Sequence, residues 1–379
     1  MAAHLRRLRH RTDQADRGGQ GRGSECRQLA GTRRAPRDAA GGRGGRRASA
    51  LWPGLAALCV LLVVVAFLSV TMGSRSIGLS AVLRALGNLG DDGSIASTVT
   101  LELRVPRTLL GILVGAALGV AGAILQGVTR NPLADAGIMG INSGAAVLVV
   151  FAITVLGVRG VGVYIWFAFA GAIAALVLVY AIASLGREGA TPVKLALAGA
   201  AVTAGLVSVT TGMVMTNVDA LNELRFWQVG SLAGRYTPIL TGVAPFLLLG
   251  LAASLGFGRA LNGLALGEDT ARGLGQHVTR TRTAAFAVVA VLAGAATAAC
   301  GPIVFVGLVV PHVARLICGP DYRWILPYSM VLAPIVLLLA DVLGRVVAAP
   351  DELQVGVLLG VLGAPAFVTI VRYGRLSEV

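Results

Sequence analysis

Residues 103–147, LRVPRTLLGILVGAALGVAGAILQGVTRNPLADAGIMGINSGAAV, decide the fold class of this chain. Two arginines flank a proline at the start of the stretch, and two apolar runs follow, separated by a polar break at 129–132. Small or amide residues recur in the first run at offsets of four, three and four, which is one face of a helix: Gly115, Gly119, Gly122 and Gln126. A face of small residues lets membrane helices approach closely. The stretch therefore predicts two closely packed membrane helices that leave room for a solute to pass.

The composition of the whole chain also indicates a membrane protein. Of 379 residues, 56% are hydrophobic and only 13% are charged, whereas soluble domains carry about 25% charged residues. Residues 1–50 contain 13 of the 32 basic residues and 4 of the 18 acids. This tail has few large apolar residues and is predicted to be disordered. It could be a basic arm on anionic lipid or a dispensable extension, and we favour the extension.

Ten apolar segments are long enough, or nearly so, to cross a bilayer. Their ranges are 51–73, 106–128, 136–157, 161–185, 193–216, 237–258, 282–300, 303–318, 325–343 and 354–372. The eighth is short and contains Pro311, which predicts a broken or half-buried helix. Short surface helices are expected in the loops 74–103 and 217–236. The fold class is therefore an all-α polytopic membrane protein with about ten transmembrane helices.

The basic residues predict the orientation and the domains. With the N-terminus inside, 24 Arg and Lys lie on the inner side and 8 on the outer side, as the positive-inside rule requires. An even number of spans then leaves both termini cytoplasmic, in the cytoplasmic (inner) membrane. We expect a basic cytoplasmic tail over 1–50, a transmembrane domain over 51–373 and a short cytoplasmic C-terminus over 374–379.

Several kinds of chemistry have no support in the sequence. There is no phosphate-binding loop, and Lys194 is the only lysine. Neither HExxH nor GxSxG occurs, no CxxC pair indicates a metal, and no basic stripe with aromatics indicates nucleic acid. Asp341 lies inside an apolar segment, but Arg345 four residues later can neutralise it, which weakens the case for a proton relay. We expect no cofactor, no metal and no catalytic residue.

The longest polar loop on the predicted inner side is 259–282. Residues 265–274 favour a helix, and Gly273 and Gly275 are typical of its end. A short helix–turn–helix flat on the cytoplasmic face is expected. The alternative is an ordinary connection, although the loop is longer than most. Its mixture of Leu, Ala and charged residues favours a docking element.

Six blocks of sequence resemble one known family in the same order. They are LRVPR (103–107), GAALGVAGAILQGVTRNPLADAGIMGINSGAA (115–146), ALGEDTARGLG (265–275), GPIVFVGLVVPHVARLICGPDYRWILP (301–327), LADVLGR (339–345) and DELQVGVLLGVLGAPAFVTIVR (351–372). Together they resemble the FecCD-type permeases, the membrane subunits of ATP-binding-cassette (ABC) importers for iron–siderophore complexes, haem and cobalamin. The resemblance covers about residues 51–372.

The resemblance implies a type II ABC importer permease that works by alternating access. Its implied partners are two separate ABC ATPase subunits, an extracellular or periplasmic substrate-binding protein, a second permease copy or paralogue, and the lipid bilayer. A ferric siderophore is the favoured substrate, before haem and cobalamin. The alternatives are an ATP-independent secondary carrier and, third, an intramembrane enzyme.

The resemblance also assigns roles to residues. Binding-protein docking is implied for Arg104, Arg107 and Arg345, whose alternative role is lipid-headgroup anchoring. ATPase coupling is implied for Glu268, Asp269, Ala271, Arg272, Gly273, Leu274 and Gly275. The inner gate aligns with Thr191, Pro192 and Val193, although Pro192 and Val193 stand where a relative has small hydroxyl residues. The translocation path or helix packing is expected to involve Gly115, Gly119, Gly122, Gln126 and Asn131.

Overall fold

The computed structural model describes residues 41–73, 77–88, 94–158, 160–185, 190–235 and 237–373. The chain divides into two compact units, Met1–Ala50 and Leu51–Val379, and the second contains the helical bundle. The predicted C-terminal segment 374–379 and residues 1–40 of the predicted tail lie outside the described residues. Helix α1 begins at Gly41, within the part of the chain that the composition predicts to be disordered.

Ten apolar helices of the described residues coincide with the ten predicted segments. Seven are long and apolar enough to cross a membrane: α1 (Gly41–Thr71), α4 (Val105–Thr129), α6 (Val161–Ala183), α7 (Pro192–Val214), α9 (Thr237–Leu255), α12 (Val278–Cys300) and α14 (Tyr322–Val347). Three are shorter: α5 (Ile141–Thr154), α13 (Val306–Cys318) and α15 (Val355–Tyr373). No strand occurs in the ranges given above. The all-α prediction is confirmed.

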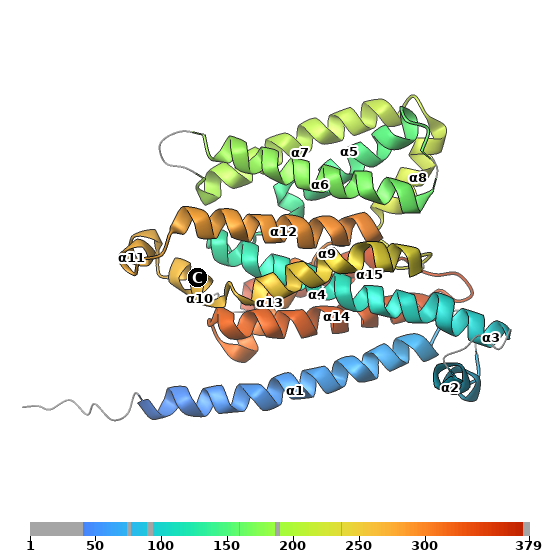
Figure 1. Ribbon diagram of the computed structural model, residues 1–379, viewed down its shortest axis with the longest axis horizontal. Helices are drawn as coiled ribbons and strands as arrows, with labels where there is room; N and C mark the ends of the chain where they lie inside the picture. The colour runs from blue at the N-terminus through green and yellow to red at the C-terminus, as the bar shows by residue number, and fades with distance from the viewer. Residues whose placement is uncertain are drawn as a thin grey trace, which may run out of the picture. The chain divides into compact units, whose positions relative to one another are not determined.

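Short helices connect the long ones and lie at the two ends of the bundle. At one end are α2 (Leu79–Asn88), α3 (Ile95–Thr98), the π-helical turn η1 (Val99–Arg104) and α8 (Val218–Gln228). At the other are α10 (Gly258–Ala265) and α11 (Glu268–Gly273), as Figure 1 shows. The surface helices predicted in the loops 74–103 and 217–236 are therefore present.

Two spans begin later than the sequence predicts, because the backbone turns at a left-handed residue first. Asp135 accepts a hydrogen bond from the Gly137 amide and caps a 3-10 turn, η2 (Ala136–Met139), which ends at Gly140 with φ of 77°. Helix α5 therefore starts at Ile141 rather than at 136. Helix α13 starts at Val306 rather than at 303, after Phe305 with φ of 68°.

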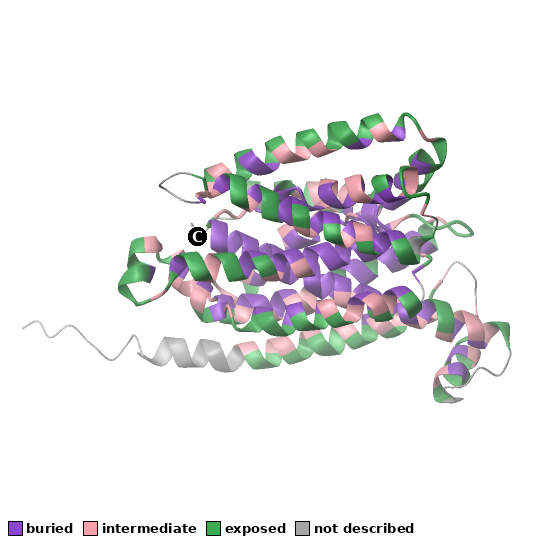
Figure 2. Ribbon diagram, turned by 45° about the horizontal axis from the view of Figure 1, so that its top comes forward, coloured by how far each residue is buried: buried purple, intermediate pink, exposed green. Residues whose placement is uncertain are grey.

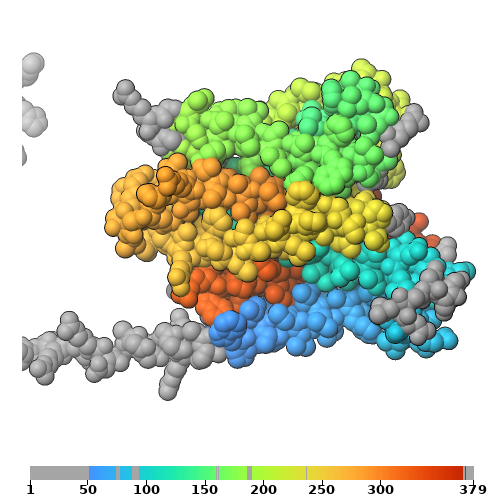
Figure 3. All heavy atoms as spheres, in the orientation of Figure 1, coloured from blue at the N-terminus to red at the C-terminus, as the bar shows by residue number. Residues whose placement is uncertain are grey.

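Burial separates the long helices into central and peripheral ones (Figure 2). In the apolar windows of α4 and α12, 83% and 72% of the residues are buried, against 28% in α7 and 17% in α1. In the space-filling view, α1 lies along one edge of the bundle, and α6 and α7 lie along the opposite edge (Figure 3). The peripheral helices carry exposed apolar side chains, which suit lipid or a protein partner.

Candidate functional site

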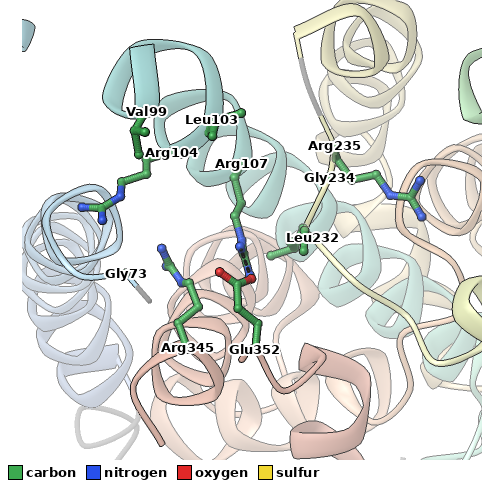
Figure 4. A pocket seen from close by; sticks show the side chains of 11 residues that line it. Gly73, Val99, Leu103, Arg104, Arg107, Leu232, Gly234, Arg235, Arg345 and Glu352 are labelled. Atoms are coloured by element: carbon green, nitrogen blue, oxygen red, sulfur yellow. Dashed lines mark hydrogen bonds and ion pairs between the residues drawn. The ribbon is translucent and has the colours of Figure 1, made fainter. Parts of the chain in front are cut away.

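A cavity of about 440 Å³ lies where α1 ends and α4 begins. Five charged residues line it: Arg104, Arg107, Arg235, Arg345 and Glu352 (Figure 4). Of the three arginines predicted to dock a partner, Arg104 ends η1, Arg107 lies in the first turn of α4 and Arg345 lies on α14, and the fold brings them together. Arg235 and Glu352 belong to loops and were not predicted, because no local pattern distinguishes them from other surface charges. We refer to this feature as the arginine cavity.

Arg107 is held by two carboxylates. Its Nε and Nη2 donate to Oδ2 and Oδ1 of Asp341 at 3.0 and 2.7 Å, and its Nη1 donates to Oε2 of Glu352 at 2.7 Å. Asp341 is 1% exposed and also pairs with Arg345 Nη2 at 3.1 Å, so the predicted ion pair on α14 is present. One buried carboxylate therefore neutralises two guanidinium groups. Removing it would leave two positive charges with less nearby negative charge to balance them.

Arg104 and Arg345 bind the end of α1. Arg104 Nη1 donates to the carbonyls of Val70 and Thr71 at 3.1 and 2.8 Å, and Arg345 Nη1 donates to those of Ser69 and Met72 at 3.0 and 2.9 Å. The last carbonyls of a helix lack intrahelical partners and favour positive charge. These arginines are 6% and 2% exposed. They cap a peripheral helix, and their docking role stays a prediction.

The glycine face of α4 is filled by neighbouring helices. A Cβ at Gly115 would lie 2.7 Å from the Pro334 Cα of α14, and one at Gly122 would collide with the Gly307 carbonyl of α13. Gly119 faces Ala333 of α14 in the same way. In this structure the three glycines are therefore points of close helix contact.

Gln126 continues the same face and is fully buried. Its Nε2 donates to the carbonyls of Gly307 and Leu308 at 3.2 and 3.3 Å, and its Oε1 accepts from Arg315 Nη1 at 2.7 Å. The amide thus joins α4 to α13. Asn131 lies in the turn after α4, where its Oδ1 accepts from the Leu133 amide at 2.9 Å.

The element predicted to couple to an ATPase consists of two short helices. The short helix–turn–helix expected in this loop is present: within the stretch 265–274 that favours a helix, Gly267, with φ of 106°, separates α10 from α11. Gly275, with φ of 81°, follows the end of α11. Leu266 and Leu274 flank α11 and are 66% and 70% exposed, and Gly273 has open space around its Cα.

One ion pair holds α11 against α12, and two others lie within α11. Glu268 pairs with Arg282 Nη2 at 2.6 Å and with Arg272 Nη2 at 2.9 Å. The hydrogen bond from Arg282 lowers the pKa of the Glu268 carboxyl below its ordinary value. Asp269 pairs with Arg272 at 3.1 Å but is fully exposed, and Ala271 is buried.

The residues aligned with the inner gate form the start of α7. Thr191 Oγ1 accepts a hydrogen bond from the Lys194 amide at 3.3 Å, and Pro192 occupies the first turn, where its missing N–H costs nothing. Val193 is 68% exposed. Arg282 Nη1 donates to the Ala190 carbonyl at 3.1 Å, so one arginine contacts both Glu268 and the residue before the predicted gate. The gate itself stays a prediction.

A second cavity, of about 620 Å³, lies among α5, α7 and α8. Its lining is mainly apolar and includes Asn142, Thr210 and Trp227. The indole Nε1 of Trp227 is buried and has no hydrogen-bond partner. Among the described residues, no three His, Cys, Asp or Glu side chains are grouped as a metal site would require.

Comparisons with known proteins agree over nearly the whole chain. A model of the FecCD transport family matches residues 61–373. The chain is 43% identical over 315 residues to the ferric enterobactin transport system permease protein FepD of Escherichia coli (strain K12), covering 83% of this chain and 93% of FepD. It is 39% identical over 329 residues to the probable siderophore transport system permease protein YfiZ of Bacillus subtilis (strain 168), covering 87% and 98%.

A solved structure shows the same fold. It is an inward-facing conformation of a metal-chelate type ABC transporter, with a TM-score of 0.74 and 27% sequence identity, covering 84% of this chain and 98% of that chain. The helical bundle and these matches define a multi-pass membrane permease of the ABC importer type. This chain belongs to the FecCD transport family.

Proposed function

We propose that this chain is the permease subunit that carries a ferric siderophore across the cytoplasmic membrane by alternating access. The observation that carries this proposal is the match along nearly the full length of relatives whose names state ferric enterobactin and siderophore transport. Haem is another candidate, and cobalamin is named for a 40% identical permease of Halobacterium salinarum. Both termini would face the cytoplasm.

The proposed assembly contains a second permease copy or paralogue, two ABC ATPase subunits and a substrate-binding protein outside the membrane. The exposed leucines beside α11 support its role as the surface that an ATPase contacts. The link from Glu268 through Arg282 to Ala190 supports transmission from α11 to the start of α7. The cavity among α5, α7 and α8 is a candidate part of the path.

The arginine cavity supports docking of acidic side chains from the binding protein. Arg107 is the best candidate for direct contact, since Arg104 and Arg345 are committed to the end of α1. A charge-complementary contact of this kind weakens as salt is added.

The test of transport is uptake into proteoliposomes that contain the permease, its ATPase and its binding protein. We expect uptake of the ferric siderophore that depends on ATP and on the binding protein. Uptake that persists without the ATPase and stops when the proton gradient is removed would favour a secondary carrier. Asp341, held by two arginines, disfavours that alternative.

The test of docking is capture of the binding protein by the assembled transporter. Arg107→Gln should weaken capture while ATPase assembly stays intact. Arg84→Gln is the matched control, because Arg84 is an exposed arginine on α2 that does not line the arginine cavity. Equal capture by both variants would contradict the docking role of Arg107.

A further inference from the structure

Glu352 occupies the arginine cavity from within the chain. It lies in the loop between α14 and α15, and its Oε2 is 2.7 Å from Arg107 Nη1 (Figure 4). Its negative charge also acts on Arg104 and Arg345 in the same cavity. A carboxylate therefore already sits where the proposed docking needs a carboxylate from another protein.

The two carboxylates that bind Arg107 differ in how firmly they are held. The side chain of Asp341 is 1% exposed, stands on the buried face of α14 and bonds two arginines. The side chain of Glu352 is 30% exposed and belongs to a loop. If Glu352 leaves, Arg107 keeps both of its bonds to Asp341 and gains a free donor at Nη1. Glu352 is thus the exchangeable carboxylate, because Arg104, Arg107 and Arg345 keep the other bonds described above when it leaves.

We propose that Glu352 is an internal competitor for the arginine cavity, and that a carboxylate of the docking protein binds by replacing it on Arg107. The inference rests on the docking role given above under the proposed function. One charge-assisted hydrogen bond is exchanged for another of the same kind. In the free permease, Glu352 partly neutralises the positive charge of the cavity. The docking protein can bind only those molecules in which Glu352 has left Arg107, so its apparent affinity is reduced in proportion to their fraction. Glu352 therefore sets the affinity of docking.

The experiment measures the dissociation constant of the binding protein for the assembled transporter in nanodiscs, at low and at high salt. Glu352→Gln retains the size of the side chain and removes its charge. If Glu352 occupies the cavity in about nine-tenths of molecules, this variant binds about tenfold more tightly. Asp351→Asn is the matched control, because Asp351 is the exposed neighbouring acid and does not line the cavity. Its affinity should equal that of the wild type. Added salt should reduce the gain from Glu352→Gln.

The outcomes separate this inference from the docking proposal. Weaker capture by Arg107→Gln with no gain from Glu352→Gln overturns the competitor role and leaves docking in place. Unchanged capture by Arg107→Gln overturns both. Glu352→Gln and Asp351→Asn could raise the affinity equally, or the rise could depend on anionic lipid in the nanodisc. Either result would report a general charge effect and would also overturn the competitor role. Glu352→Asp, which keeps the charge on a shorter side chain, should bind with intermediate affinity and provides a second readout if the Gln variant unfolds.

Discussion

Helices α4 and α7 look alike in sequence and have opposite places in the fold. Both are apolar, have 25 and 23 residues, begin with a proline in the first turn and contain several glycines. In their apolar windows, 83% of the α4 residues are buried and only 28% of the α7 residues. The glycines on the predicted face of α4 meet other backbones, whereas Gly205 and Gly212 of α7 meet open space. Apolar content therefore predicts that a helix enters the membrane, and the contact made by its small residues decides whether it becomes the core.

The two helices also differ in how their starts are held. The start of α4 carries Arg107, which depends on a buried carboxylate of α14. The start of α7 is stabilised locally by the Thr191 cap and receives one bond from Arg282 at Ala190. Substitutions in and around α4 should therefore cost more stability than matched substitutions at α7.

The largest effect is expected from Asp341→Asn. The change removes the negative charge that pairs with Arg107 and Arg345 inside the protein. Breaking a buried ion pair costs about 3–5 kcal/mol of stability. The measurement is thermal unfolding of the purified permease in detergent. Asp351→Asn, at an exposed acid, should melt like the wild type. Equal melting of the two variants would mean that the shared carboxylate does not hold α4 to α14.

The next largest difference in stability is expected between Gly122→Ala and Gly205→Ala. A methyl group at 122 collides with the backbone of α13, and overpacking of this kind costs about 1–3 kcal/mol. At 205 the methyl group meets nothing, and the better helix propensity of Ala should stabilise α7 by up to about 1 kcal/mol. Opposite shifts in melting temperature are expected. Shifts of the same sign and size would remove the distinction between the two helices.

An effect of the same order is expected from Gln126→Ala, which is compared with Thr211→Ala on α7. Loss of the Gln126 amide leaves two carbonyls and one donor of Arg315 with fewer partners, which costs about 1–3 kcal/mol. The Thr211 hydroxyl donates within its own helix, to the Val207 carbonyl. Melting curves of both variants provide the measurement, and only the Gln126 variant should melt earlier.

The smallest effect concerns the ion pair beside α7 and depends on pH. The pKa of Glu268 is lowered in the folded protein, mainly by Arg282. The stabilisation is therefore present above the unfolded pKa and lost as the pH falls through the folded pKa. Glu268→Gln should melt earlier at pH 7, by the equivalent of about 0.5–1 kcal/mol. The difference should shrink as the pH falls below the unfolded pKa of about 4.3 and vanish below the folded pKa. Asp269→Asn, at a fully exposed carboxylate, is the matched control and should melt like the wild type at pH 7. A difference for Glu268→Gln that persisted at low pH would show that the charge of Glu268 is not its cause.

Much of the fold could be predicted, because bilayer crossing depends on local composition. The ten apolar segments, the surface helices and the i,i+4 pair of Asp341 and Arg345 all follow from spacing along one helix. Helix starts were less predictable where a non-glycine residue takes a left-handed conformation, as Phe305 does before α13. The helix–turn–helix in the loop 259–282 was expected, but the position of its turn at Gly267, with φ of 106°, depends on a backbone conformation that residue type alone does not fix.

The candidate site could be predicted only in part. The resemblance brought Arg104, Arg107 and Arg345 together as a group, but their partners belong to other elements. Neither the capping of α1 nor the contact of Arg107 with Glu352, 245 residues away, has a signal in local sequence. Glu352 was missed for that reason, although the proposed competition for Arg107 depends on it.

The sequence by itself determined that this chain enters a membrane many times, which face of α4 is smooth, and to which family it belongs. These properties depend on residue type and on spacing within one helix. Only the tertiary structure decided that α4 is central while α7 is peripheral, that Arg104 and Arg345 bind the end of α1, and that Glu352 lines the arginine cavity and binds Arg107. Those outcomes require contacts between distant elements, and a buried charge or a glycine face has no defined partner until the helices pack.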